Sequence, residues 1–165
     1  SEHNANQLSQ VIQTIEQWIG FQREDYSQAN FSETVTTSSH LVDSIFTIYR
    51  DLYQKVITHS EAQKALHTLR MPEQNEPFLS AYFEALVLCS QSIYPDRDHA
   101  ELTKKISGVM QLMHNQQGVG EMIHEMIEGG LLSQIDFLWG SSDQQLEDTL
   151  RAKFYFDATS ASIAS

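Results

Sequence analysis

The stretch from Phe78 to Tyr94 constrains this chain most, because it is long, strongly apolar and charged only at Glu84. Pro77 precedes it, where the first turn of a helix tolerates proline, and Pro95 follows it, where a helix must end. A helix built from this stretch is apolar around nearly its whole circumference, at Leu79, Tyr82, Phe83, Leu86, Val87, Leu88, Cys89 and Ile93. Such a helix is surrounded by others. We therefore predict an all-α fold organised around a central helix over residues 78–94.

Most of the remaining chain has apolar residues at the three-and-four spacing of amphipathic helices. A first helix is expected from Leu8 to about residues 27–30. A second, over residues 41–57, has two adjacent apolar stripes: Leu41, Ile45, Ile48 and Leu52, beside Val42, Phe46, Tyr49, Tyr53 and Val56. The spacing Ser60-x-x-Gln63 predicts a capping box at the start of a short third helix.

These patterns together predict a single helical domain over residues 1–156, with about six or seven helices, and a loosely ordered tail over residues 157–165. Only the segment from Lys153 to Asp157 has some β character. A chain of 165 residues is long enough to bury a core without a disulfide or a metal. The single cysteine, Cys89, lies in the apolar stretch and is expected to be a small buried hydrophobe.

The balance of 22 acidic against 10 basic residues gives a net charge of −12. That charge disfavours nucleic-acid backbones and anionic membranes as partners and permits a basic protein or a cation. Even spacing of the acids is also what solubility alone produces. One cysteine and no signal-like start favour a reducing, cytoplasmic setting, and the apolar stretch is too short and too polar to span a membrane.

A candidate metal site lies at Glu121, His124 and Glu125, with Glu128 on the same helical face. Glu-x-x-His on a helix is the ligand unit of carboxylate-bridged di-metal bundles. Such sites need two units that point inward, and a second unit is not evident. Because the apolar residues Met122, Ile123, Met126 and Ile127 face the opposite way, a solvated acidic face is the favoured interpretation.

Glu84 is the second candidate, because a carboxylate within an apolar helix must reach solvent, find a partner or change its pKa. It belongs either to a narrow polar strip with Ser80 and Gln91 or to a small-ligand pocket. If it is buried, Arg50, Lys55, His59 and His67 are candidate partners.

Catalytic motifs are missing: the chain has no Gly-x-Ser-x-Gly, no P-loop, no dinucleotide fingerprint and no zinc spacing. We therefore predict a non-enzymatic cytoplasmic protein without cofactors that acts by protein–protein interaction, either with a basic partner or as a homodimer. The dimer is suggested by the double stripe of residues 41–57, since large apolar patches are uncommon on monomers. The alternatives are a metal–carboxylate protein that uses Glu121, His124 and Glu125, and a small-ligand sensor that uses Glu84.

Overall fold

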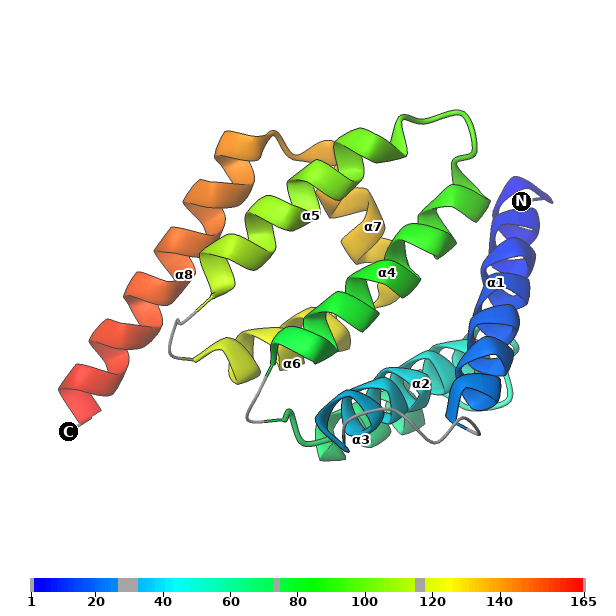
Figure 1. Cartoon of the computed structure of the whole chain (residues 1–165), viewed down its shortest axis with the longest axis horizontal. Helices are drawn as coiled ribbons and strands as arrows, with labels where there is room; N and C mark the ends of the chain where they lie inside the picture. Colours follow the sequence, from blue (N-terminus) through cyan, green and yellow to red (C-terminus); the bar gives the residue numbers. More distant parts are fainter. Residues whose placement is uncertain (1, 27–32, 73–74, 115–117, 165) are drawn as a thin grey trace. The chain divides into compact units, whose positions relative to one another are not determined.

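The computed structural model describes residues 2–26, 33–72, 75–114 and 118–164, with side chains described for residues 6–20, 38–72, 75–114 and 118–153. Within these ranges the regular structure is entirely helical, which confirms the predicted all-α fold (Figure 1). The helices of the described ranges are α1 (Glu2–Tyr26), α2 (Glu33–Tyr53), α3 (His59–Thr68), α4 (Glu76–Ile93), α5 (His99–Met113), α6 (Val119–Glu128), α7 (Leu131–Gly140) and α8 (Asp143–Ala164). The segment with some β character, from Lys153 to Asp157, lies in α8.

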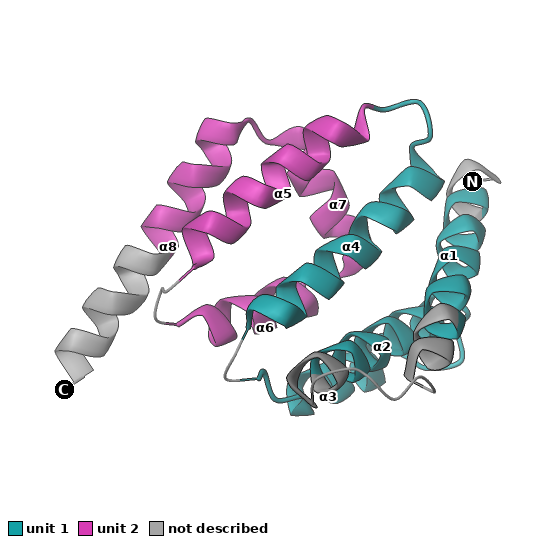
Figure 2. Cartoon of the chain, viewed as in Figure 1, with its two compact units in different colours: residues 1–97 teal, residues 98–165 magenta. Residues whose placement is uncertain are grey.

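The chain divides into two compact units, residues 1–97 and residues 98–165 (Figure 2). The first unit holds α1 to α4 and the second holds α5 to α8. The single domain predicted for residues 1–156 stays a prediction beside this division. The loosely ordered tail predicted for residues 157–165 also stays a prediction, because it lies outside the residues whose side chains are described. The backbone of α8 continues through it to Ala164.

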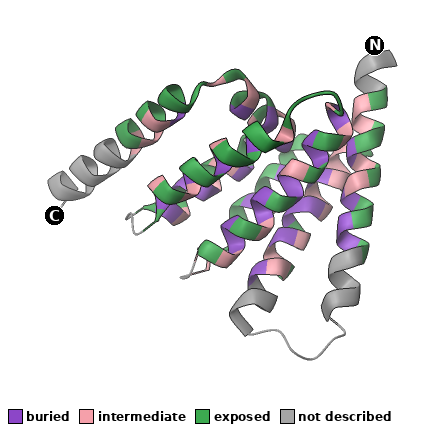
Figure 3. Cartoon of the chain, turned by 45° about the horizontal axis from the view of Figure 1, so that its top comes forward, coloured by how far each residue is buried: buried purple, intermediate pink, exposed green. Residues whose placement is uncertain are grey.

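Helix α4 is the apolar stretch that the sequence singles out, and within the first unit it packs on α1 and α2. Pro77 lies in its first turn, and the helix ends two residues before Pro95. Its buried residues are Phe78, Leu79, Tyr82, Phe83, Ala85, Leu86, Cys89, Ser90 and Ile93. Its exposed residues within the described range after Glu76 form one narrow strip of Ser80, Glu84, Leu88 and Gln91. Figure 3 shows such stripes of burial along the helices.

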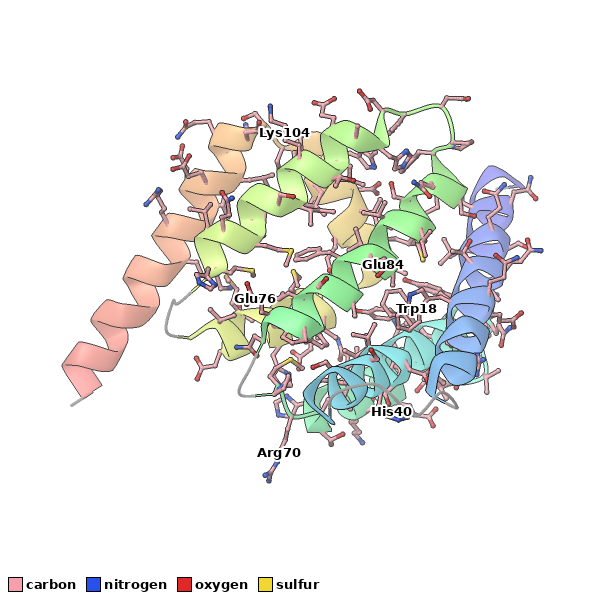
Figure 4. The ribbon with its side chains drawn as sticks, in the orientation of Figure 1. Trp18, His40, Arg70, Glu76, Glu84 and Lys104 are labelled. Carbon is pink, nitrogen blue, oxygen red and sulfur yellow. The ribbon has the colours of Figure 1, made fainter. Side chains whose placement is uncertain are left out.

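Aromatic rings fill the space where α1, α2 and α4 meet. The ring centroid of Phe46 on α2 lies 5.6 Å from that of Trp18 on α1 and 5.8 Å from that of Tyr82 on α4. Tyr82 stacks on Phe78 at 5.7 Å. The Trp18 side chain extends from α1 toward this cluster (Figure 4). Ring pairs at such distances contribute about 0.5–1.5 kcal/mol each beyond the area they bury, so the cluster joins three helices strongly.

Helix α2 has the two apolar stripes predicted for residues 41–57, although the helix itself runs from Glu33 to Tyr53. Val42, Ile45, Phe46 and Tyr49 are buried, whereas Leu41, Ile48, Leu52 and Tyr53 are half-buried. The helix packs on α1, α3 and α4. The stripe residues within α2 therefore have neighbours in the chain, and covering them does not require a second copy. Val56, the last residue predicted for the second stripe, lies beyond the helix and is 68% exposed.

Helix α3 begins directly after Thr58, so the capping box predicted at Ser60 and Gln63 was wrong. The box is formed by Thr58 and Glu61 instead. Thr58 Oγ1 accepts a hydrogen bond from the Glu61 N–H at 3.2 Å, and the Glu61 carboxylate accepts one from the Thr58 N–H at 3.1 Å. Both pairs have the required spacing. Glu61 is the stronger partner because its charge also interacts with the positive end of the helix dipole.

In the second unit, α5 and α8 lie side by side, and α7 also packs on α5. Helix α5 begins after Asp98, whose carboxylate accepts a hydrogen bond from the Ala100 N–H at 3.1 Å. Lys105 of α5 reaches the end of α7, where its Nζ donates to Leu138 O at 3.2 Å and to Ser141 O at 2.8 Å. An ammonium group that satisfies the last carbonyls of a helix also favours the negative end of its dipole. Lys105 therefore ties α7 to α5.

Among the helices of the described residues, none combines the length and the apolar composition needed to cross a bilayer.

Candidate functional site

The polar face of α6 is formed by Glu121, Glu125 and Glu128, which we call the acidic stripe. All three side chains are exposed. At 100° per residue they lie within about 60° of one another around the helix. The opposite face buries Val119, Met122, Ile123 and Ile127. Burial of that apolar face fixes how α6 is rotated, and the stripe is directed to solvent as a consequence.

The metal candidates Glu121, His124 and Glu125 are thus placed on one helix, with His124 half-buried and both glutamates exposed. Glu125 forms an ion pair with Lys153 of α8. In the part of the chain whose side chains are described, no three His, Cys, Asp or Glu residues come together as a group that could hold a metal ion. The metal hypothesis stays a prediction.

Glu84, the candidate for a ligand pocket, lies on the exposed strip of α4 (Figure 4). Of the partners considered for it, Arg50 forms an ion pair with the neighbouring Asp51 at 3.3 Å. Lys55 and His59 are exposed beyond the end of α2. An exposed carboxylate keeps its hydration and needs no buried partner. The small-ligand hypothesis at Glu84 stays a prediction.

Cys89 is buried on the same helix, as the sequence suggested. Burial raises the pKa of its thiol to about 12, because the thiolate would lose its hydration. The thiolate is the reactive form of cysteine. At neutral pH Cys89 is therefore a neutral packing residue and not a nucleophile.

Phe137 on α7 is not among the candidate residues that the sequence suggested. The buried residues of α7 are Leu131, Ile135 and Leu138, and Phe137 is 51% exposed. The helical spacing contained this signal, since Phe137 lies about 100° or more around the helix from each of those three residues. A large exposed aromatic ring on the helix that follows the acidic stripe is typical of an interaction surface.

A groove of about 570 Å³ lies in the second unit between α5 and α8. Its lining combines Lys104, Lys105 and Arg151 with Asp143 and Glu147. Arg151 pairs with Glu147 at 2.8 Å, and Lys105 is engaged with the end of α7. A Cβ atom built on Gly108, in the groove wall, would meet no atom within 4 Å. Opposite charges therefore line the groove together, and two of its cations already have partners within the second unit.

Comparisons with protein-family models, with curated proteins and with solved structures give no match to this chain.

Proposed function

We propose that this chain is a non-enzymatic cytoplasmic protein that binds a protein partner with a basic surface, and that the acidic stripe and Phe137 belong to the binding surface. The exposure of the acidic stripe carries the proposal. Glu125 pairs with Lys153 of α8, so Glu121 and Glu128 supply most of the local negative potential that attracts Lys and Arg side chains and speeds their encounter.

Phe137 adds an apolar contact that charged side chains do not provide. Interfaces depend on a few large side chains that become fully desolvated, and aromatic residues are enriched among them. Asp136, which is also exposed, directly precedes this ring. The expected partner surface therefore has an apolar pocket for Phe137 surrounded by basic residues.

The proposal is tested by affinity capture from native cytosol, with the chain immobilised and eluted first at low and then at high salt. We expect a basic protein that binds at low salt and is released at high salt, because added salt shortens the Debye length and screens the attraction between exposed charges. The double variant Glu121→Lys/Glu128→Lys should lose this protein, and Phe137→Ala should weaken its binding.

The matched control is Glu16→Lys/Glu84→Lys, which changes the net charge equally at two exposed positions of the first unit. It should retain the captured protein. Equal loss in both double variants would reduce the signal to net charge, and undiminished capture by Glu121→Lys/Glu128→Lys would refute the assignment to the acidic stripe.

A further inference from the structure

A group of basic side chains lies in the first unit, where α2 ends and α3 follows. Residues 55–70 hold only one of the twelve acidic residues of this unit but three of its six Lys and Arg residues, Lys55, Lys64 and Arg70. The one acid, Glu61, accepts hydrogen bonds from Thr58 in the capping box, so its charge is directed at the start of α3. We call Lys55, Lys64 and Arg70 the basic corner. It is a local excess of positive charge on a chain whose net charge is −12.

All three side chains of the basic corner are exposed. Lys64 is two residues from each of the buried residues of α3, Ala62 and Leu66, so it lies about 160° around the helix from both. Arg70 follows the helix, and its side chain points away from the helices of the first unit (Figure 4). Packing of α3 therefore directs these cations outward.

Other cations of the chain are already engaged. Among the side chains that the structure describes, four cations bind a carboxylate or carbonyl group of the same chain: Arg50, Lys105, Arg151 and Lys153. Within the same described residues, no hydrogen bond or ion pair engages the side chains of Lys55, Lys64 and Arg70. The charge of the basic corner is thus available to a ligand from outside the chain.

The basic corner begins at a Schellman motif with two unusual residues. Val56 N–H donates to Asp51 O at 2.8 Å, and Lys55 N–H donates to a carbonyl one turn back at 3.0 Å. Lys55 has a φ of 63°, in the left-handed region that favours glycine. An apolar residue at the Val56 position of this motif usually packs back on the helix, but Arg50 and Asp51 stand there, and Val56 is 68% exposed. Such departures from what folding favours cluster at functional sites.

We propose that the basic corner is a docking site for an acidic segment of a partner protein. Carboxylates of that segment bind Lys64 and Arg70, and an apolar side chain beside them packs on Val56. Charged groups around an apolar contact are the usual composition of a protein interface. The proposal uses neither the acidic stripe nor Phe137, so it can fail or succeed independently of the proposed function.

Charge complementarity favours a short acidic peptide over a nucleic acid as the occupant. Helix α3 has ten residues, a length of about 15 Å at 1.5 Å per residue. A DNA duplex carries a charge about every 1.7 Å along its axis and extends well beyond such a surface. Its outlying phosphates would meet the rest of the first unit, where acidic residues outnumber basic ones. A peptide confined to the basic corner avoids that repulsion.

Binding of the full chain to an array of short synthetic peptides tests the proposal. The peptides combine Asp and Glu with one Leu, Ile or Phe, and matched copies have Asn and Gln in place of the acids. The wild type should bind the acidic peptides and not the amide copies. For the tightest peptide, Lys64→Glu/Arg70→Glu should raise the dissociation constant at least about tenfold in fluorescence anisotropy, because it replaces attraction by repulsion. Val56→Ser should raise it about threefold or more, through loss of the apolar contact.

Lys104→Glu on α5 is the matched control for Lys64→Glu, since both replace an exposed lysine of a helix and change the net charge equally. Lys104 lies in the groove of the second unit beside Asp143 and Glu147, and its replacement should leave the dissociation constant unchanged. Each variant should keep the circular dichroism spectrum of the wild type, because the replaced side chains are exposed. If Lys64→Glu alters that spectrum, Lys64→Gln replaces it in the comparison.

Four results overturn the proposal. The first is that no peptide of the array binds, and the second is that the amide copies bind as well as the acidic peptides. The third is that Lys104→Glu weakens binding as much as Lys64→Glu does. The fourth is that a single-stranded oligonucleotide or a phosphatidylserine vesicle binds the wild type more tightly than any peptide and loses that binding in Lys64→Glu/Arg70→Glu.

Discussion

Helices α3 and α6 have the same length of ten residues, but they form for different reasons. Helix α3 buries only Ala62 and Leu66 and closes its first turn with the Thr58–Glu61 capping box. Helix α6 buries twice as many side chains, and the residue at its N-cap, Gly118, has no side chain with which to cap it. A short helix is too costly to nucleate without help. The capping box stabilises the first turn of α3, whereas burial of the apolar face stabilises α6.

The two helices also differ in the residue that turns the chain before them. Gly118 precedes α6 with a φ of 80°, and Lys55 precedes α3 with a φ of 63°. Glycine adopts this conformation without strain, whereas lysine does not. The exposed faces also differ in charge, since α6 presents the acidic stripe whereas α3 presents Lys64 and His67.

The largest expected effect tests packing in α6. Ile123 is fully buried, so Ile123→Ala should lower the free energy of unfolding by about 2–5 kcal/mol, through lost transfer energy and the cavity left behind. Urea unfolding followed by circular dichroism measures it. Glu121→Ala, on the exposed face, should cost no more than about 1 kcal/mol. A small loss for Ile123→Ala would mean that α6 does not depend on its apolar face.

The second-largest expected effect compares the turn at Gly118 with the turn at Lys55. Gly118→Lys should lower the free energy of unfolding by about 1–2 kcal/mol, the cost of the left-handed conformation for a residue with a side chain. Lys55→Gly should raise it by about 0.5–1 kcal/mol, because released strain exceeds the added freedom of the unfolded chain. Thermal unfolding measures both variants. A destabilised Lys55→Gly would show that lysine is not strained there.

A smaller effect tests the end signal of α3. Thr58→Ala removes the side-chain acceptor of the Glu61 N–H and should cost about 1 kcal/mol. Thr58→Ser keeps the hydroxyl and should recover most of that loss. Hydrogen exchange of the α3 amides, combined with urea unfolding, locates the change. If Thr58→Ala is neutral, contact with α2 and not the capping box determines where α3 begins.

The all-α class could be predicted from the sequence because buried residues recur along a helix with a regular spacing. The apolar residues of α4 and the proline on each side of it defined that helix almost to its ends, and its polar strip was visible at Glu84. Helix starts were harder to predict, as Ser60 and Thr58 show, because two overlapping pairs satisfy the same spacing rule and only the folded chain selects one.

The candidate surfaces were predictable only in part. The acidic stripe follows from the spacing of Glu121, Glu125 and Glu128. Phe137 and Val56 were not recognised, because an apolar residue within an apolar segment looks like core until its neighbours are placed. The strain at Lys55 has no sequence signal, since it depends on a backbone conformation that glycine would normally supply.

The smallest expected effect concerns metal, and it decides whether the polar face of α6 contributes to stability. If packing alone holds α6, Glu121→Gln and His124→Ala should leave metal content unchanged and stability nearly so. The exposed glutamate and the half-buried histidine of these variants lie on one helix, and bundle sites of this kind need an inward-facing second unit. Elemental analysis of the purified chain, together with urea unfolding, measures both quantities. Stoichiometric iron, manganese or zinc that is lost in both variants would instead mean that the polar face of α6 is a ligand surface. Helices α3 and α6 would then differ in metal-binding chemistry as well as in packing.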